Sequence, residues 1–130
     1  MPRSNDVGVG VAVALIDPDG RVLLGRRKGA HGQGQWSFPC GWIDRVDGSI
    51  KAACLREVRE ETGLVVSWHS ASRMRRLIET SNDYPSNGFC VITLFYRVSV
   101  SAREAKAIKV VEPDKCEEWR WLSTDDAHAL

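Results

Sequence analysis

Three glutamates stand close together in a segment with helical spacing. Glu57, Glu60 and Glu61 precede Gly63, and at about 100° per residue their carboxylates fall on one stripe of a helix. Like charges at these spacings each cost a helix roughly a few tenths of a kcal/mol. Mg²⁺ and Mn²⁺ prefer a few carboxylates combined with substrate phosphates. The segment therefore indicates a divalent-cation site, although Arg56 and Glu60 could instead form an ordinary surface ion pair.

This segment resembles the Nudix box, whose pattern is G-x5-E-x7-R-E-U-x-E-E-x-G-U, where U is a bulky aliphatic residue. The second half of the pattern is matched without a gap from Arg56 to Leu64. The first half departs, because Gly48 stands where the family has a glutamate and the loop is one residue longer. Asp47 is the nearest acid. Either Asp47 fills the missing role from the shifted loop, or the role is empty.

The resemblance implies a role for each acid of the segment. Glu57 and Glu61 are the expected metal ligands, and Glu60 shares or bridges. A glycine lets the backbone approach a ligand closely, so the Gly41 carbonyl is expected to be a further ligand. Arg56 is expected to orient the carboxylates. The general base stays open between Glu60 and an acid outside the box, for which the resemblance favours Glu112. The expected catalytic set is Glu60, Glu61, Arg56, Asp47 and Glu112, and the expected metal set is Gly41, Glu57, Glu60 and Glu61.

A basic, glycine-rich segment lies before the box, from residue 25 to residue 36. Its three consecutive cations could clamp phosphate oxygens, since arginine gives bidentate contacts. In the small nucleotide-cleaving members of the family an arginine at the position of Arg27 meets phosphate, so Arg27 and Lys28 are expected to bind substrate. His31 is expected to be a surface residue.

Trp36 and Phe38 alternate with polar or small residues in the next segment, which predicts a strand over part of 36–42. Their rings could stack on a nucleobase or pack in the core. Both are included among the expected substrate-binding residues.

Hydrophobic periodicity predicts strands mixed with one long and one short helix. The D-P-D-G turn after residue 16 predicts a hairpin between the first two strands. The long helix is expected to begin near Ser49 or Asp47, either of which can cap it, and to end at Gly63. The predicted strands are 7–16, 21–24, part of 36–42, 65–70, 73–80, 89–100 (the clearest buried one) and 116–122, with a loop over 81–88 and a helix starting within 123–130.

The length of 130 residues and the 43% hydrophobic content predict a single domain spanning 1–130, of the α+β class. The resemblance implies that this is a Nudix-type α/β/α sandwich with a mixed sheet and a loop-helix-loop box. The net charge of +1 gives no global attraction to nucleic acid or to a membrane. No apolar run approaches the roughly 18 residues of a membrane span. Four scattered cysteines favour a reduced, cytoplasmic protein without a zinc site.

The resemblance to small MutT-like members of the family implies hydrolysis of a nucleoside triphosphate, normal, modified or oxidised. The products are the monophosphate and pyrophosphate, the cofactor is Mg²⁺ with Mn²⁺ as a substitute, and the partners are a small-molecule substrate and a second copy in a homodimer, with no nucleic acid and no membrane. Two alternatives stay open. One is hydrolysis of an isoprenoid diphosphate, and the other is a catalytically weak nucleotide-binding domain, because the box lacks its first glutamate.

Overall fold

The central strand of the fold is β1, Val7–Ile16, in a seven-stranded mixed sheet. The computed structural model describes residues 7–29, 32–84 and 89–130, and for 82–84 and 89 it describes the backbone alone. β1 runs parallel to β6, Phe89–Ser99, over its whole length. Its other edge pairs antiparallel with β4, Cys40–Trp42, and then with β2, Val22–Arg27. The remaining elements are β3 (Trp36–Ser37), the 3₁₀ turn η1 (Arg45–Asp47), α1 (Ile50–Thr62), α2 (Trp68–Ala71), β5 (Arg75–Tyr84), α3 (Ala102–Lys106), β7 (Cys116–Leu122) and α4 (Thr124–His128).

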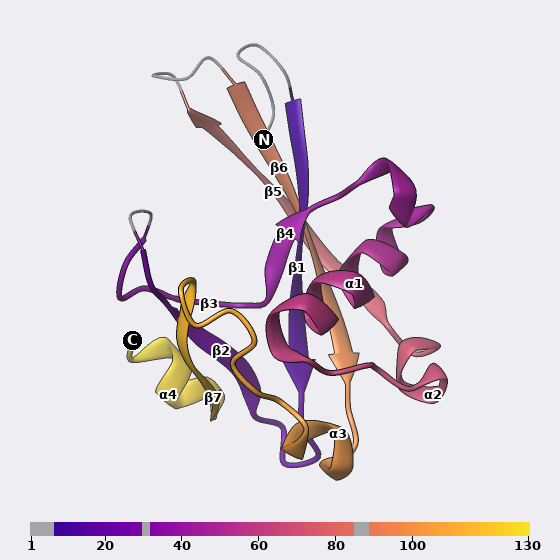
Figure 1. The fold of residues 1–130 in the computed structure, drawn as a ribbon, viewed down its shortest axis with the longest axis vertical. Helices are drawn as coiled ribbons and strands as arrows, with labels where there is room; N and C mark the ends of the chain where they lie inside the picture. Colours follow the sequence, from indigo (N-terminus) through magenta and orange to yellow (C-terminus); the bar gives the residue numbers. More distant parts are fainter. Residues whose placement is uncertain (1–6, 30–31, 85–88) are drawn as a thin grey trace.

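Side chains alternate between the two faces of β1 and create a core on each. Val13 and Leu15 are fully buried beneath α1, where they share the main core with Val58. Ala14 points to the opposite face and belongs to a smaller cluster that includes Ala127 of α4. The sheet is therefore covered by α1 on one face and partly by α4 on the other, as Figure 1 shows. This arrangement confirms the α+β class and the mixed sheet.

The predicted hairpin is also confirmed. The carboxylate of Asp17 accepts hydrogen bonds from the backbone N–H groups of Asp19 at 3.0 Å and Arg21 at 2.8 Å, which fixes the turn between β1 and β2. The predicted strand over 116–122 and the terminal helix are present as β7 and α4. No helix in the described ranges is long and apolar enough to span a membrane.

Two local predictions were wrong, and one helix was missed. The segment 65–70 is not a strand, because Ser67 caps the short helix α2 by accepting a hydrogen bond from Ser70 N–H at 3.2 Å. Residues 81–84 are not a loop, since they extend the antiparallel pairing of β5 with β6, while 85–88 lie outside the described residues. α3 was not anticipated, although Ser101 and Glu104 form a capping box.

From Tyr96 to its end β6 is buried on one face only, although its composition suggested a buried strand throughout. Tyr96 and Val98 lie in the main core, whereas Arg97 and Ser99 between and beyond them are exposed. The exposed face of β6 is the face opposite α1.

Candidate functional site

The helix α1 is fixed at both ends by its own sequence. Ser49 Oγ accepts a hydrogen bond from Ala52 N–H at 3.0 Å, so Ser49 and not Asp47 is the N-cap. Gly63 adopts a left-handed conformation with φ of 75°, and its N–H donates to the Arg59 carbonyl at 2.9 Å. The glutamates of α1 are therefore presented from a rigid element.

Glu57 is the buried carboxylate of the helix, with 8% of the residue exposed. Its carboxylate packs directly against the backbone of Gly41 in β4, and a Cβ at that position would overlap it. Gly41 is therefore required by this contact. Burial raises the pKa of Glu57 even though the neighbouring Arg56 acts to lower it.

Glu61 lies one helical turn further on and faces the same strand. Its Oε2 accepts a hydrogen bond from Cys40 N–H at 3.3 Å. Burial raises the pKa of Glu61 to about 8, against that hydrogen bond, and the negative charges of Glu57 and Glu112 add to the effect. The two carboxylates thus share a buried, negatively charged environment. No three His, Cys, Asp or Glu side chains among the described residues already converge as a metal cage.

Arg56 connects the acids of the box. Its guanidinium donates to Glu57 Oε1 at 2.9 Å and to Glu60 Oε2 at 3.1 Å. It also donates to the Trp42 carbonyl at 2.9 Å, which ties the helix to the end of β4. The remaining donors of Arg56 meet Asp47. The predicted orienting role therefore has the geometry it needs.

Asp47 reaches Arg56 through both carboxylate oxygens. Arg56 Nε donates to Oδ1 at 2.6 Å and Nη2 donates to Oδ2 at 3.0 Å, and only 3% of the Asp47 side chain is exposed. The hydrogen bonds from Arg56 lower the pKa of Asp47, as does a further bond from Asp44 N–H at 2.7 Å. Gly48 follows in a left-handed conformation with φ of 78°. The longer loop thus turns back and brings the shorter acid to the arginine.

The backbone of β4 presents a different carbonyl from the one predicted. The Gly41 oxygen points toward β1, where it lies 3.2 Å from the position that a Cβ would take on Gly10. In an antiparallel pair the N–H and C=O of one residue point to the same edge. Because the Cys40 N–H meets Glu61, the Cys40 carbonyl is the one that faces the helix. This orientation does not support the predicted Gly41 carbonyl ligand.

Arg27 is the predicted phosphate contact that the structure brings to the carboxylates. Its positive charge acts to lower the pKa of Glu61 and that of the Cys40 thiol, although burial dominates and raises the latter to about 11. Lys28 follows at the end of β2, where its N–H donates to the Lys115 carbonyl at 2.9 Å. The Lys28 side chain is exposed and makes no ion pair within the described part of the chain. His31 lies outside the described residues.

Trp36 and Phe38 are not beside the carboxylates. Both are half-buried and belong to the smaller hydrophobic cluster on the sheet face opposite α1. The Phe38 ring meets Phe95 edge-on, with centroids 6.1 Å apart, and Arg120 lies over the Trp36 ring at 5.0 Å. Core packing accounts for these contacts, and base stacking stays a prediction.

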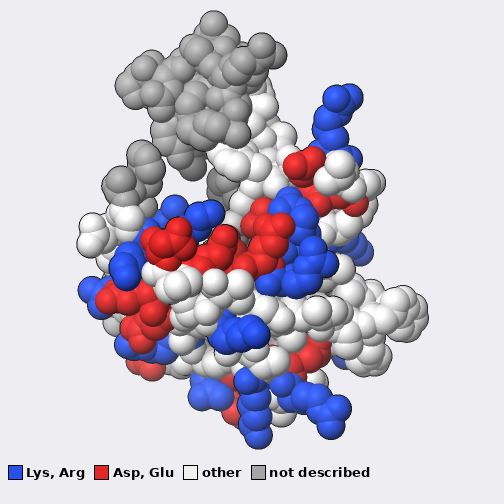
Figure 2. All heavy atoms as spheres, viewed as in Figure 1, with Lys and Arg blue, Asp and Glu red and all other residues white. Residues whose placement is uncertain are grey.

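Glu112 and Glu60 differ in how they are held. Glu112 is half-buried, contributes to the raised pKa of Glu57 and Glu61, and makes a weak ion pair with Lys115 at 3.5 Å. Glu60 is exposed and bound to Arg56. Figure 2 shows a band of acidic side chains across the face that carries α1, with basic side chains at both ends of the band.

The NUDIX domain model matches residues 6–130. The chain belongs to the NUDIX family. The crystal structure of a MutT NUDIX hydrolase from Burkholderia pseudomallei superposes with a TM-score of 0.76 at 30% identity, covering 92% of this chain and 85% of that one.

Two curated relatives of this NUDIX chain match over shorter lengths. The RNA pyrophosphohydrolase of Caulobacter vibrioides is 44% identical over 54 residues, which are 42% of this chain and 31% of that protein. The CTP pyrophosphohydrolase of Escherichia coli K12 is 37% identical over 70 residues, 52% of this chain and 51% of that protein. The matched part of the chain thus spans about a third to a half of these relatives. Both names describe enzymes that cleave phosphoanhydride bonds.

The NUDIX site also uses residues that the sequence analysis did not identify. Cys40 and Trp42 contribute backbone groups, to Glu61 and Arg56 respectively. Trp119 of β7 donates from Nε1 to the Glu61 carbonyl at 3.3 Å and so holds the end of α1. Backbone contacts leave no side-chain signal in a sequence. The Trp119 contact joins residues far apart in the chain, so local patterns could not have revealed it.

Proposed function

We propose that this NUDIX chain hydrolyses a diphosphate linkage in a nucleoside triphosphate, normal, modified or oxidised, to the monophosphate and pyrophosphate. Mg²⁺ is the proposed cofactor, with Mn²⁺ as a substitute. The observation that carries the proposal is the pair of buried Glu57 and half-buried Glu61, one helical turn apart against β4, whose pKa values are both raised. A buried charge without full compensation costs free energy and is retained where it binds a cation.

The donor set fits a small divalent cation. Two carboxylates one turn apart and the facing Cys40 carbonyl supply a few oxygen ligands and leave other positions for water and phosphate, which suits Mg²⁺. When bound, the cation supplies positive charge beside the phosphate oxygens and makes water a better nucleophile. Glu60 is a weaker ligand than predicted, since it is exposed and already paired with Arg56.

The residues of the chain divide the remaining work. Arg56, held by Asp47, keeps the Glu57 carboxylate oriented. Arg27 lies at the end of β2, where its guanidinium can contact a phosphate beside the carboxylates. Lys28 is exposed at the same strand end and adds positive charge there.

Glu112 is favoured over Glu60 as the general base. A base needs a lone pair within reach of the attacking water. Glu60 is bound to the Arg56 guanidinium, whereas Glu112 has only its weak contact with Lys115 and lies close enough to influence both buried carboxylates.

The alternatives from the sequence have unequal support. The contact of Asp47 with Arg56 restores an acid to the position where the box lacks one, which argues against a catalytically weak binding domain. The relatives named above act on nucleotides, which favours a nucleotide over an isoprenoid diphosphate. The RNA pyrophosphohydrolase match supports a second substrate, the triphosphorylated 5′ end of an RNA.

A substrate panel tests the proposal. Purified protein with Mg²⁺ is offered nucleoside triphosphates, oxidised deoxynucleoside triphosphates, a 5′-triphosphorylated oligoribonucleotide and an isoprenoid diphosphate. Phosphate release is measured with and without coupled pyrophosphatase, and the Glu57→Gln/Glu61→Gln double variant serves as the control. We expect nucleotide-dependent pyrophosphate release that EDTA abolishes. Turnover of the isoprenoid diphosphate alone, or activity that survives in the double variant, would contradict the proposal.

A further inference from the structure

Two arginines face each other directly on neighbouring strands, away from the carboxylate site. The pairing of β5 with β6 places Arg75 opposite Arg97. Tyr96 and Val98, on either side of Arg97, are buried in the main core beneath α1. Arg97 and its partner therefore project from the opposite face of the sheet. Like charges directly opposite in an antiparallel pair are destabilising, so this pair needs a reason other than folding.

No described acid neutralises these arginines. Arg73, just before β5, joins Arg75 and Arg97 at the same place, and all three are exposed. None of the three makes an ion pair with any side chain in 7–29, 32–81 or 90–130. The whole chain has a net charge of only +1. The three positive charges are therefore a local concentration and not part of a generally basic surface.

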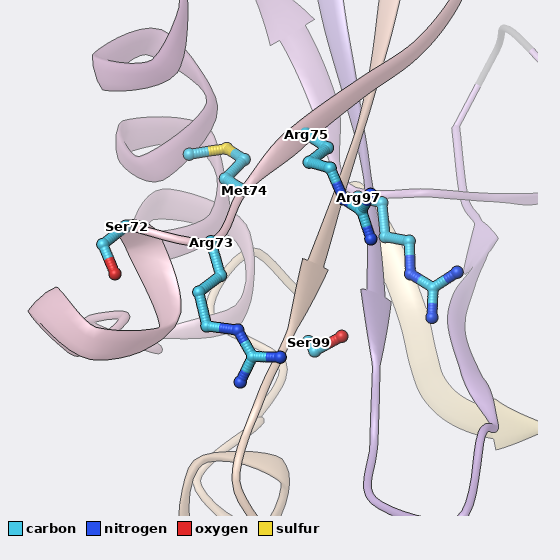
Figure 3. Close-up of a pocket in the computed structure, with 6 residues that line it drawn as sticks. All are labelled: Ser72, Arg73, Met74, Arg75, Arg97 and Ser99. Atoms are coloured by element: carbon cyan, nitrogen blue, oxygen red, sulfur yellow. The ribbon is translucent and has the colours of Figure 1, made fainter.

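The arginines line an open hollow in the surface with a volume of about 460 Å³. Figure 3 shows Arg73 extending toward Ser99, with Arg75 and Arg97 projecting side by side from their strands. Ser72 and Ser99 add two hydroxyl groups to the lining. The hollow thus combines guanidinium forks with the Ser99 hydroxyl, since the Ser72 hydroxyl donates to the His69 carbonyl at 2.7 Å, and its lining has no acidic group.

We propose that Arg73, Arg75 and Arg97 form a second anion site that binds an oligophosphate. Guanidinium groups match phosphate oxygens bidentately, and three of them suit a ligand that carries several charges on adjacent phosphates. A bound oligophosphate would also remove the repulsion between Arg75 and Arg97. The site lies on the other face of the sheet from Glu57 and Glu61, so it is distinct from the proposed metal site.

Calorimetric titration of the full chain with inorganic tripolyphosphate, in EDTA to remove metal-dependent binding, tests this site through the difference between two double variants. The variants are Arg75→Ala/Arg97→Ala and, as a control with the same charge change, Arg76→Ala/Arg103→Ala. Arg76 pairs with Tyr96 and so projects from the face that carries α1, away from Arg75 and Arg97. Arg103 lies on α3. We expect the first pair to weaken binding at least 10-fold and the control pair to weaken it less than 3-fold.

Thermal unfolding and a second anion complete the experiment. Tripolyphosphate should raise the melting temperature of the wild type, and the Arg75→Ala/Arg97→Ala variant should lose that response while remaining folded. Equal weakening in both double variants would show general electrostatic attraction and overturn the site. Citrate binding as tightly as tripolyphosphate would overturn its assignment to phosphate. Mn²⁺ binding is unaffected by these variants if the two sites are separate, so failure here leaves the proposed hydrolase function untouched.

Discussion

The pKa values of the acids on α1, Glu57 and Glu61, are shifted in the opposite direction from that of Asp47 in the preceding loop. Glu57 is buried and Glu61 half-buried, and burial raises the pKa of both, although Arg56 contacts Glu57 and Cys40 N–H donates to Glu61. Asp47 receives two hydrogen bonds from Arg56 and one from a backbone N–H, and its pKa is lowered. The difference separates two kinds of acid, one whose charged form is disfavoured by burial until a cation binds and one whose charge positions another residue.

The loop before α1 departs from the family pattern but still places an acid, Asp47, beside Arg56. Position 48, where the pattern has glutamate, is a glycine in a left-handed conformation. The 3₁₀ turn Arg45–Asp47 precedes it and is closed by Asp44. The extra residue and the tight turn together compensate for an aspartate side chain one methylene shorter. A residue-by-residue comparison with the family pattern therefore misses the contact of Asp47 with Arg56.

Removing one of the two proposed metal ligands, Glu57 or Glu61, should change kcat the most. Glu61→Gln or Glu57→Gln should lower kcat by on the order of 10²-fold or more, since cation charge stabilisation supplies several kcal/mol. The fold should survive, because the substitution relieves like-charge repulsion on α1. Steady-state kinetics at saturating Mg²⁺ and a melting curve check both points. Glu79→Gln, an exposed acid on β5, is the matched control and should change neither.

The next effect concerns Asp47, the acid held by Arg56. Asp47→Ala should lower kcat by roughly 10-fold to 100-fold, the range seen when a partner that orients a metal ligand is lost. Arg56 would lose the contact that fixes it beside Glu57. The measurement is kcat together with the melting temperature of the same variant.

Two controls decide what Asp47 does. Asp47→Glu should recover part of the activity, because its carboxylate can still bind Arg56. Ser49→Ala removes the true N-cap of α1, so it should cost about 1 kcal/mol of stability and leave kcat nearly unchanged. If Asp47→Ala lowered only the melting temperature, as Ser49→Ala does, the positioning role would be wrong.

A smaller effect is expected from Arg27, whose positive charge acts on Glu61. Arg27→Ala should raise KM about 10-fold with little change in kcat, as for the loss of one charge-assisted contact to a phosphate. Inhibition constants of mono-, di- and triphosphate analogues measure this, and the triphosphate should lose most. Arg103→Ala is the control, since Arg103 is an exposed arginine on α3. Equal inhibition constants across the series would remove Arg27 from the substrate site.

The smallest effect is expected at Glu104 of α3, which is not part of the proposed active site. Burial works against the charge of Glu104, but hydrogen bonds from Ser101 N–H, Ser67 N–H and the Ser70 hydroxyl lower its pKa below the ordinary value of 4.5. A lowered pKa contributes stability above 4.5, and that stability is lost as the pH falls through the folded-state pKa.

Glu104→Gln should therefore reduce the free energy of unfolding at pH 7 by about 1 to 2 kcal/mol, because hydrogen bonds to a charged group are lost. The difference from the wild type should shrink in acid. Urea unfolding at several pH values measures it, and kcat should stay unchanged. A difference that stayed constant down to pH 2 would contradict the assignment.

Local patterns sufficed for the regular part of the fold. Alternation and turn residues predicted the β1–β2 hairpin, and the helical spacing of the glutamates predicted α1. The short helices α2 and α3 were missed, because each is a single capped turn or little more. Tertiary hydrogen bonds from Ser67 and Ser70 to Glu104 of α3 hold the two helices together. The polar end of β5 is a strand because β6 supplies its hydrogen bonds, which composition does not record.

The site was predictable where side chains carry the chemistry and not where the backbone does. The family pattern identified Arg56, Glu57 and Glu61 directly. The sequence left two roles open for Asp47, and the three-dimensional path of the loop was needed to show its contact with Arg56. The choice between the Gly41 and Cys40 carbonyls depends on strand pairing, which no residue pattern encodes.

Cation binding in the absence of substrate is the most direct check on Glu57 and Glu61 as the metal ligands. Titration of the protein with Mn²⁺, followed by the electron paramagnetic resonance signal of the free ion, compares the wild type with Glu57→Gln/Glu61→Gln and with the control Glu79→Gln. We expect the wild type and the control to bind Mn²⁺ with the same affinity and the double variant to bind at least 10-fold more weakly. Retention of wild-type affinity by the double variant would contradict the assignment of Glu57 and Glu61 as the metal site.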